Sequence, residues 1–476
     1  MTLSQFHHSL KTPALLGELR AGLIGEGAMI PGLHGDVPLV YADYVASGRA
    51  LRQVEDFIAS SVLPYYANSH TEASYCGGYM TRLRREARAE IARITGAGED
   101  CAVIFAGAGA TAGLNRLVSL FGIAQARKPV VFIGPYEHHS NILPWRESGA
   151  QVVEIPECAE TGGPDLAALE EALKAHGDAD LRIGAFSAAS NVTGIITDPD
   201  PVTRLLKAHG AKAVWDYAGA GPYLPITMGT GSDAAKDAVV VSPHKFPGGP
   251  GASGVLILRK AAVARNAPSW PGGGTVSFVS PWGHEYSRDL ATREEAGTPN
   301  VIGDIRAALA FLVKEAVGED VIAERECAHN AAALAGWQSN PRLSLLGAGH
   351  PHRLPIYSFL VRDREGNPVH QQLFTRMLSD VYGIQARGGC ACAGPYAHRL
   401  LGIDRAASEA LFSDLQAGRE LRKPGWVRLN FSYLMSEETA RYVIDSVNAL
   451  TERCADLAPL YAADPSTARF KPARAA

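Results

Sequence analysis

Seven short apolar runs lie between residues 101 and 259, and longer amphipathic stretches separate most of them. Runs of this length predict strands buried on both faces, whereas the stretches between them have the length and the Ala, Leu and Glu content of helices. This alternation predicts an α/β fold with a mainly parallel central sheet and helices on both faces. Ligands bind such sheets beyond the carboxyl ends of the strands. The runs are 101–107, 129–134, 150–156, 181–187, 211–216, 238–243 and 253–259.

The pattern changes on both sides of this region. A Gly/Pro-dense passage at 267–283 interrupts it, a long helical stretch follows at 301–338, and residues 352–390 then predict strand, helix and strand, as in a smaller α+β domain. The Ala-rich end, 463–476, is expected to be frayed. We therefore expect an N-terminal segment (1–40) packed on the small domain, a large domain (41–300) and a small C-terminal domain (301–476).

Composition excludes several classes of protein. The 476 residues are 46% hydrophobic and 20% charged, which is ordinary globular usage. A formal charge of −4 is too close to balance to indicate a nucleic-acid or membrane partner, so a small-molecule substrate is expected. The N-terminus lacks the pattern of a signal peptide, and no apolar run is long enough to span a membrane, so we expect a soluble, cytoplasmic protein.

The seven cysteines are odd in number and mostly scattered along a long chain. This distribution argues against a secreted disulfide framework and favours a reducing compartment. Only one pair is closely spaced, Cys390 and Cys392.

A lysine follows one of the predicted strands, in the sequence SPHKFPGGPG at 242–251. An amine held at a strand end, with its pKa lowered by burial and neighbouring charge, suits nucleophilic and base chemistry on a carbonyl compound. The pattern by itself fits a surface lysine in a loop equally well. Other segments have to decide between the two interpretations.

Three residues at predicted strand ends match the needs of the ring of pyridoxal phosphate. Asp216 ends its strand and could keep the ring nitrogen protonated, so that the ring draws electrons from the substrate. His138 follows another strand and could stack on the ring, and Asn191 could donate to the phenolic oxygen. Taken singly, these residues also fit a helix cap, a surface histidine and a turn.

The phosphate of the same cofactor needs backbone N–H groups at a helix N-terminus, which AGAGATAG at 106–113 offers directly after a strand. Ser242 and His244 can add donors to that phosphate. A lone glycine pattern is weak support. The interpretation depends on all these groups lying at strand ends of one α/β region and converging on one ligand.

These segments resemble, in order, the motif series of class V, fold-type I enzymes that depend on pyridoxal phosphate. The similarity is strongest to cysteine desulfurases and selenocysteine lyases, and it spans about residues 40–450. The motifs are GAT (109–111), EHHSNILPW (137–145), SNVTG (190–194), DYA (216–218), SPHK (242–245), GGGT (272–275) and EAGTPN (295–300).

The resemblance implies a role for each residue of the expected cofactor site. Lys245 would form the Schiff base with the cofactor, Asp216 would pair with the pyridinium, His138 would stack on the ring and Asn191 would reach its phenolic oxygen. Thr298 would come from the second subunit, which implies a homodimer. The expected phosphate ligands are Gly109, Ala110, Thr111, Ser242, His244 and Thr298.

Two arginines are candidates for the substrate. Arg428 lies in a predicted strand, where a bidentate fork to the α-carboxylate of an amino acid would satisfy it. The family has its carboxylate-binding arginine in such a strand. Arg387 and Asn191 complete the expected substrate site. The alternative for Arg428 is an unremarkable arginine on a half-exposed strand.

The segment ARGGCACAGP (386–395) places Cys390 and Cys392 in a Gly-rich loop, which suits a mobile thiol that reaches a substrate sulfur. The thiolate is the attacking species, and nearby Arg387 would favour it. A C-x-C pair could instead bind a metal, but no second Cys/His pair with suitable spacing accompanies it, so no metal is expected. The alternatives are inert thiols or an adventitious disulfide. By resemblance, Cys392 is the persulfide cysteine, and the C-x-C form is similar to the N-terminal domain of molybdenum cofactor sulfurases.

The sequence departs from the family at Gly219, where glutamine is usual, and in a longer segment between Cys392 and Arg428. We expect an enzyme that removes sulfur from L-cysteine or an analogue, releases alanine and passes the sulfur to a protein or thiol acceptor. Another class V reaction, such as transamination, epimerisation or β-elimination, would not need the loop cysteine. A non-catalytic sulfur-relay protein with the same fold is the third alternative.

Overall fold

The computed structural model describes residues 2–69 and 72–473, and these form two compact units. Unit 1 contains the described residues up to Leu23, together with Ser47–Ala189 and Ile196–Glu319. Unit 2 contains Ile24–Ala46, Ser190–Ile195 and the described residues from Asp320 onward. The chain therefore crosses between the units several times.

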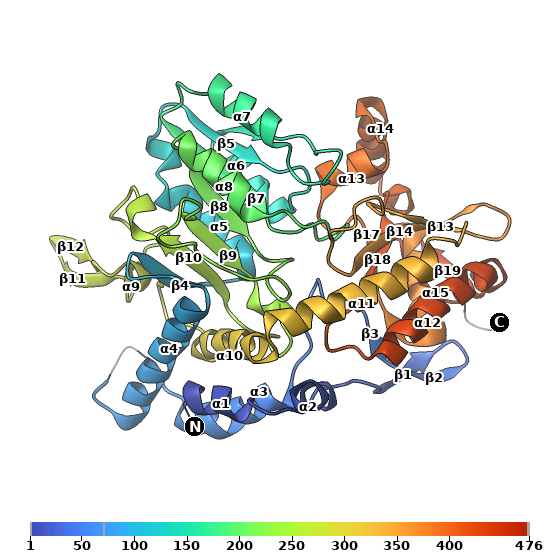
Figure 1. The fold of residues 1–476 in the computed structure, drawn as a ribbon, viewed down its shortest axis with the longest axis horizontal. Coiled ribbons are helices and arrows are strands. Elements are labelled where there is room, and N and C mark those ends of the chain that lie inside the picture. Colours follow the sequence, from blue (N-terminus) through green and yellow to red (C-terminus); the bar gives the residue numbers. More distant parts are fainter. Residues whose placement is uncertain (1, 70–71, 474–476) are drawn as a thin grey trace. The chain divides into compact units, whose positions relative to one another are not determined.

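Unit 1 is built around a seven-stranded sheet with the order β4-β10-β9-β8-β7-β5-β6 (Figure 1). All neighbouring strands are parallel except β10, which runs antiparallel to β4 and β9. The mainly parallel sheet predicted from the apolar runs is thus confirmed. Its strands are β4 (Cys101–Gly107), β5 (Pro129–Ile133), β6 (Gln151–Glu154), β7 (Leu181–Ser187), β8 (Lys212–Asp216), β9 (Ala238–Val241) and β10 (Gly254–Arg259).

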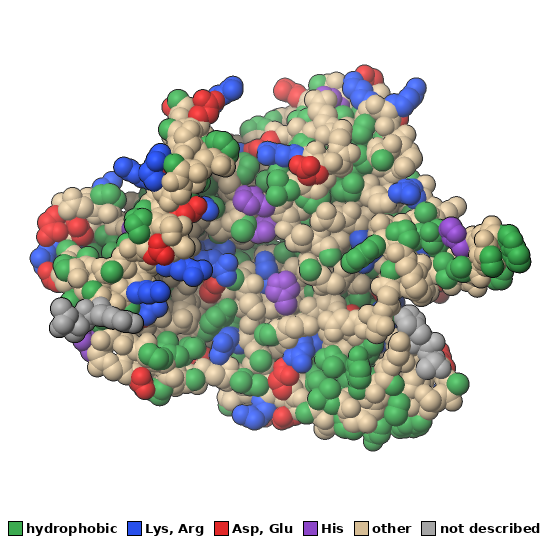
Figure 2. Space-filling model, turned by 180° about the vertical axis from the view of Figure 1, so that it is seen from behind, with side chains coloured by type: hydrophobic (Ala, Val, Ile, Leu, Met, Phe, Trp, Pro, Cys, Tyr) green, Lys and Arg blue, Asp and Glu red, His purple; other side chains and the backbone are tan. Residues whose placement is uncertain are grey.

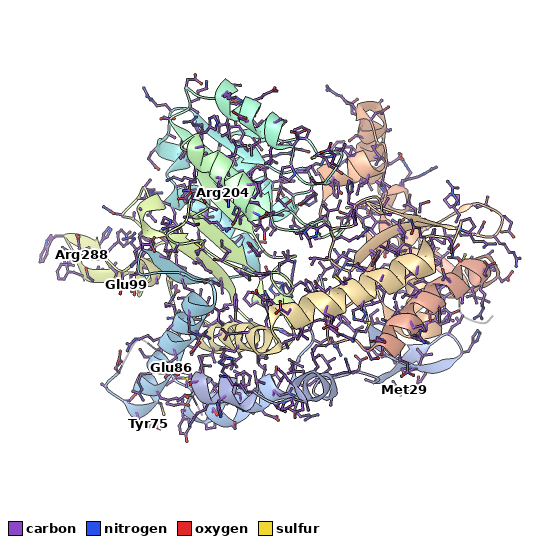
Figure 3. The ribbon with its side chains drawn as sticks, viewed as in Figure 1. Met29, Tyr75, Glu86, Glu99, Arg204 and Arg288 are labelled. Atoms are coloured by element: carbon purple, nitrogen blue, oxygen red, sulfur yellow. The ribbon has the colours of Figure 1, made fainter. Side chains whose placement is uncertain are left out.

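Helices cover both faces of this sheet because the strands are apolar on both sides. Leu114 and Leu117 of α5 (Gly109–Leu120) pack into the core cluster on one face. On the other face, α8 (Pro199–Ala208) approaches β7 so closely that a Cβ at Gly184 would lie 2.4 Å from Leu206 Cδ1. The outer side of α8 is polar, and its Arg204, labelled in Figure 3, pairs with Asp233.

Further helices and a hairpin complete unit 1. The hairpin of β11 and β12 exposes large apolar side chains, among them Trp282 at 93% exposure, and Figure 2 shows hydrophobic side chains at the tip of this projection. The remaining elements are α1 (Leu3–Ser9), α2 (Leu15–Ala21), α3 (Arg52–Phe57), α4 (Tyr75–Ile94), α6 (Leu143–Glu147), α7 (Leu166–Ala175), β11 (Val276–Ser280), β12 (Gly283–Tyr286), α9 (Leu290–Glu294) and α10 (Val301–Val317).

Unit 2 packs helices on a sheet with the order β13-β14-β18-β17, which is the α+β arrangement predicted for the smaller domain. Its core joins Trp337, Phe359 and Phe374 to the apolar face of a long C-terminal helix. The elements are β1 (Met29–Gly32), β2 (Gly35–Pro38), β3 (Val40–Tyr41), α11 (Glu319–Trp337), β13 (Leu343–Leu345), β14 (Ile356–Arg362), β15 (Pro368–Val369), α12 (Gln371–Tyr382), β16 (Ile384–Gln385), β17 (Arg387–Gly389), α13 (Gly394–Leu400), α14 (Arg405–Gln416), β18 (Trp426–Asn430), α15 (Glu437–Leu457), β19 (Tyr461–Asp464) and β20 (Arg469–Pro472).

The division differs from the expected segments at both ends of the large domain. Residues up to Leu23 belong to unit 1, because α1 packs against α4 and α10, and only Ile24–Ala46 belong to unit 2. The long helix expected at 301–338 is two helices, because Gly318 between them has a φ of 87°, which an α-helix cannot accommodate. The boundary therefore falls near residue 319, not 300.

The C-terminal end is ordered further than the Ala-rich composition predicts. Strands β19 and β20 pair as an antiparallel hairpin, with Tyr461 opposite Pro472, and residues 474–476 lie outside the described part. Within the described residues, no helix has both the length and the apolar character needed to cross a membrane.

Candidate active site

Asp216 and Lys245 lie at the carboxyl ends of adjacent strands in unit 1. Asp216 is the last residue of β8 and is buried, and its Oδ1 accepts a hydrogen bond of 2.7 Å from the Ala218 amide. Lys245 ends a 3₁₀ turn, Pro243–Lys245, just after β9 and is half-buried. Burial raises the pKa of Asp216, and the charge of Lys245 opposes this shift. A cation beside this carboxylate would stabilise its ionised form.

The first turn of α5 forms a cradle against Ser242 and His244, which directly precede Lys245. The Ala110 amide donates to Ser242 Oγ at 2.9 Å, and Gly109 has a φ of 59°. A Cβ at Gly109 would lie 2.9 Å from Ser242 Oγ and 3.0 Å from His244 Cε1, so a side chain there would fill the cradle. The N-cap residue, Ala108, has no side-chain oxygen to accept the first-turn amides. The cradle therefore suits an anion such as a phosphate.

His244 borders the cradle as a neutral imidazole. Burial, with the neighbouring Lys245 charge, lowers the pKa of His244 to about 4. At neutral pH its ring can therefore donate one hydrogen bond and accept another.

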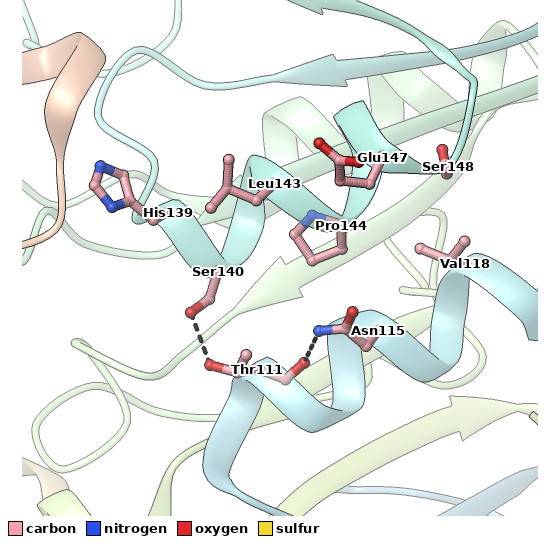
Figure 4. A pocket seen from close by; sticks show the side chains of 9 residues that line it. All are labelled: Thr111, Asn115, Val118, His139, Ser140, Leu143, Pro144, Glu147 and Ser148. Carbon is pink, nitrogen blue, oxygen red and sulfur yellow. Dashed lines mark hydrogen bonds between the residues drawn. The ribbon is translucent and has the colours of Figure 1, made fainter. Parts of the chain in front are cut away.

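A hydroxyl pair connects the EHHSN segment to the cradle. The Ser140 amide donates to His138 Nδ1 at 3.1 Å, so in the neutral ring of His138 the proton lies on Nε2. Ser140 Oγ lies 2.7 Å from Thr111 Oγ1 (Figure 4). A pocket of about 430 Å³ opens beside these hydroxyls, with Leu143 and Pro144 on its apolar wall.

Glu137 is a functional candidate that the sequence analysis missed. Its carboxylate is buried and accepts hydrogen bonds from the Ser187 amide at 2.8 Å, Ser187 Oγ at 2.5 Å and Asn141 Nδ2 at 2.6 Å. Burial raises the pKa of Glu137 to about 7; these hydrogen bonds oppose the shift, and the charge of Asp216 adds to it. The EHHSN motif indicated only the histidine, because nothing in the sequence shows that the carboxyl points inward.

Thr298 lies exposed on the loop between α9 and α10. The base of that loop is held by Glu295, whose carboxylate accepts from Arg88 Nη1 and Nη2, both at 2.9 Å, and from the Phe105 amide at 2.8 Å. The same carboxylate also pairs with Arg84. Thr298 therefore projects from a firmly anchored loop.

Unit 2 holds the other predicted group, centred on Arg428 in β18. Arg428 is buried, and burial lowers its pKa although Asp43 opposes the shift. Its Nη2 donates to Asp43 Oδ1 at 2.9 Å and its Nη1 to the Asn191 carbonyl at 3.2 Å. Its buried Nε has no hydrogen-bond partner among the described residues. Asp43 thus takes part of the guanidinium that the sequence analysis assigned wholly to a substrate carboxylate.

Asp43 also holds the second predicted arginine. Arg387 Nε donates to Asp43 Oδ2 at 3.0 Å, while the Arg387 side chain stays 51% exposed. Two guanidinium groups and one carboxylate leave a net charge of +1 in this group. An anion with a single charge, such as an α-carboxylate, would neutralise it.

The loop that carries the cysteine pair forms a tight turn. Ala393 N donates to the Cys390 carbonyl at 3.1 Å, and Asn191 Nδ2 donates to the Ala391 carbonyl at 2.9 Å. Ala391 and Cys392 have φ values of 53° and 56°, in the left-handed region. Cys392 is exposed, Cys390 is half-buried, and Arg428 interacts electrostatically with Cys392.

Asn191 lies in this second group rather than with Asp216 and Lys245 in unit 1. Its Oδ1 is buried and has no hydrogen-bond partner among the described residues, so an acceptor remains available there. The sequence could not predict the contact between Asn191 and the cysteine loop, because 200 positions separate Asn191 from Ala391.

The first group fits pyridoxal phosphate on structural grounds. It offers an anion cradle that requires glycine, a buried carboxylate suited to a cationic ring nitrogen, an amine and a histidine ring. In the parts of the chain that the structure describes, no cluster of three or more His, Cys, Asp or Glu residues could hold a metal ion.

Comparison with known proteins agrees with this chemistry. The sequence model of the family described as aminotransferase class V matches residues 40–439. The chain belongs to the aminotransferase class V family. Enzymes of this family depend on pyridoxal phosphate, and the predicted fold-type I architecture is confirmed.

Its curated relatives within the class V family include cysteine desulfurases. One from Enterobacter sp. is 32% identical over 371 residues, which cover 75% of this chain and 85% of the relative. Another, from Shigella sonnei, is 30% identical over 365 residues, with the same shares covered. The resemblance to cysteine desulfurases found in the motifs is therefore confirmed.

Solved structures show the same class V fold. The apo structure of a cysteine desulfurase from Thermococcus onnurineus has a TM-score of 0.72 and 24% identity, and the match covers 87% of this chain and 94% of that one. The cysteine desulfurase CsdA of Escherichia coli has a TM-score of 0.67 and 21% identity, with 94% and 98% covered.

Proposed function

We propose that this chain is a cysteine desulfurase that binds pyridoxal phosphate, takes sulfur from L-cysteine as a persulfide on Cys392, and releases alanine. The observation that carries the proposal is the turn at Cys390–Ala393, whose exposed thiol lies in the field of Arg428. The 30–32% identity to curated cysteine desulfurases supports the same reaction.

Residues of unit 1 would hold the cofactor. The first-turn amides of α5, with Thr111, Ser242 and His244, would bind its phosphate, and Lys245 Nζ would hold its aldehyde carbon. Asp216 would accept from the ring nitrogen, where the positive charge offsets the cost of burying the carboxylate. When bound, pyridoxal phosphate supplies an electron sink that acidifies the α-carbon of an amino acid. Freed Lys245 would then move the α-proton.

Residues of unit 2 would bind the substrate and receive its sulfur. Arg428 Nε and the exposed end of Arg387 would bind the α-carboxylate, while Asp43 fixes both guanidinium groups. The Cys392 thiolate would attack the substrate sulfur: the new S–S bond forms, the Cβ–S bond breaks, and its electron pair goes to the carbon skeleton. That skeleton is protonated and leaves as alanine. A thiol or a sulfur-acceptor protein would then take the sulfur from Cys392.

The test compares Cys392→Ala with Cys327→Ala, a matched change at another exposed cysteine. Both proteins are loaded with pyridoxal phosphate and given L-cysteine, and alanine and loop-bound sulfur are measured. We expect Cys392→Ala to bring alanine formation close to background and to leave the loop with neither added sulfur nor a disulfide. Cys327→Ala should match the parent.

Alanine formation at the parental rate by Cys392→Ala would refute the nucleophile assignment. An oxo acid or an inverted amino acid as product would instead favour the alternative class V reactions, which do not need the loop cysteine. A second subunit and a cytoplasmic location stay predictions.

A further inference from the structure

The turn at Cys390–Ala393 contains a second thiol that the proposed reaction does not use. The two cysteines flank Ala391, and the hydrogen bond from Ala393 N to the Cys390 carbonyl closes the turn around them. Asn191 Nδ2 fixes the peptide between them by donating to the Ala391 carbonyl. The spacing of the two cysteines is thus held from both sides.

The left-handed conformation brings the two cysteines close together. With helical φ values, the Cα atoms of residues i and i+2 lie roughly 5.4 Å apart, as the radius and rise of a helix require. Cysteines joined by a disulfide have Cα atoms about 4.4–6.8 Å apart, a range that includes the helical spacing. Fully extended backbone would put them roughly 6.6 Å apart, near its upper limit.

Glycine and asparagine are the residues that usually adopt positive φ at both central positions of a turn. Here the two positions hold Ala391 and Cys392, with φ values of 53° and 56°. A strained conformation of this kind persists only where the surroundings impose it, and such residues cluster at functional sites. The Asn191 amide and the closing hydrogen bond supply that constraint.

We propose that Cys390 resolves the persulfide on Cys392 and releases the sulfur as hydrosulfide. The Cys390 thiolate attacks Cys392 Sγ, a disulfide forms between the two residues, and the bond to the outer sulfur breaks. The outer sulfur keeps the electron pair and leaves as hydrosulfide, so it is reduced while Cys390 Sγ is oxidised, and Cys392 Sγ keeps its oxidation level. A thiol reductant then reopens the disulfide. This inference rests on the persulfide of the proposed function.

Access favours this order of events. Cys392 is exposed and can reach an external sulfur, whereas Cys390 is half-buried and less open to an external thiol. Disulfides held in strained, accessible loops are reduced readily, so the cycle can turn over with a small thiol. The other five cysteines lie elsewhere in the chain and offer no such neighbour in sequence.

The experiment is a single turnover of the holoenzyme with an equimolar amount of L-cysteine and no reductant. The reaction is quenched with acid and an alkylating agent. The mass of the peptide that contains both cysteines is then measured by mass spectrometry, and alanine and free sulfide are quantified. We expect a loop peptide lighter by two hydrogens, unreactive to the alkylating agent, and sulfide equal to alanine. In Cys390→Ser and Cys390→Ala, the peptide should gain one sulfur on Cys392, and the sulfide yield should fall at least about tenfold.

Cys327→Ser serves as the matched control and should behave like the parent. A parental loop that keeps its persulfide and an alkylatable Cys390 would overturn the inference, as would sulfur moved onto Cys390 itself. Those results would leave the proposed function standing, because alanine would still form. Absence of alanine together with an unmodified loop would overturn both.

Discussion

At the scale of single residues, two buried carboxyl groups set the electrostatics of the candidate site. Glu137 lies with Asp216 at the carboxyl edge of the sheet in unit 1, and Asp43 joins two arginines in unit 2. The two carboxyl groups differ in their partners. Glu137 has no cationic partner in its hydrogen bonds, and burial raises its pKa to about 7, whereas Asp43 pairs with Arg387 and Arg428.

Glu137 makes folding stability depend on pH. Its pKa is about 7 in the folded protein against an ordinary 4.5, so the folded state binds the proton more tightly. The contribution is fully present below about pH 4.5 and is lost as the pH rises through about 7, by about 3 kcal/mol at most. Glu137→Gln removes this titration. We expect its urea midpoint to fall less than the parental midpoint between about pH 5 and pH 8.

The slope is the observable, because glutamine has a single acceptor oxygen, cannot accept at both the Oε1 and the Oε2 position as Glu137 does, and so changes the absolute stability as well. Equal slopes in the parent and in Glu137→Gln would show that Glu137 is ionised throughout this range.

Replacing Asp43 should lower the free energy of unfolding far more than replacing its exposed partner, Arg387. Asp43→Asn leaves Arg428 buried with an uncompensated charge, which should lower the free energy of unfolding by about 3 kcal/mol. Arg387→Gln removes an exposed partner and should cost less than about 1 kcal/mol. Urea unfolding of both variants measures the difference. Similar losses in the two variants would show that Arg428 does not depend on Asp43.

Residues that carry chemistry at strand ends were predictable from the sequence, but their partners were not. Lys245 and Asp216 follow apolar runs and could be found by reading along the chain. The contact between Asp43 and Arg428 joins residues 385 positions apart, and no local sequence pattern predicts it. The burial of Glu137 depends likewise on Ser187, 50 positions away.

At the scale of elements, strands buried on both faces were predictable because burial requires continuous apolar runs. All seven runs in unit 1 are strands of one sheet. The hairpins β1–β2 and β19–β20 were missed because their residues are mostly exposed and show no such pattern. The break at Gly318 was missed because a single glycine inside a helical stretch does not by itself indicate a break.

Glu295 joins two elements of unit 1, since its carboxylate binds Arg84 and Arg88 of α4 and the Phe105 amide of β4. Glu295→Ala would leave two partly buried arginines and an amide without this acceptor, and should cost about 3–5 kcal/mol. Thermal unfolding should show a large fall in Tm. The matched control is Glu72→Ala, which removes the exposed partner of Arg85 on the same helix and should cost less than about 1 kcal/mol. A small effect of both changes would mean that α4 is held by its apolar face alone.

At the scale of the whole molecule, the family resemblance predicts a homodimer, and light scattering should give twice the chain mass of 50.5 kDa. If Thr298 serves the partner's cofactor site, Thr298→Ala should weaken cofactor binding about tenfold in its own homodimer. Mixed dimers of Thr298→Ala with Lys245→Ala should then recover parental affinity in one of their two sites.

In such a mixed dimer, the site with an intact Lys245 would receive an intact Thr298 from the other chain. Cofactor titration, followed by absorbance, distinguishes the outcomes. Mixed dimers that bind as weakly as the Thr298→Ala homodimer would show that each chain uses its own Thr298. A monomeric mass in light scattering would remove the partner contribution altogether.

The path of the chain between the two units limits how this protein can be cut or recombined. A fragment from Asp320 onward would keep the loop cysteines and Arg428 but lose Asp43 and Asn191, which reach unit 2 on separate short segments. Such a piece would retain the nucleophile without the carboxylate and amide that hold its surroundings. Unit 2 can therefore not be exchanged at a single junction without losing Asp43 and Asn191.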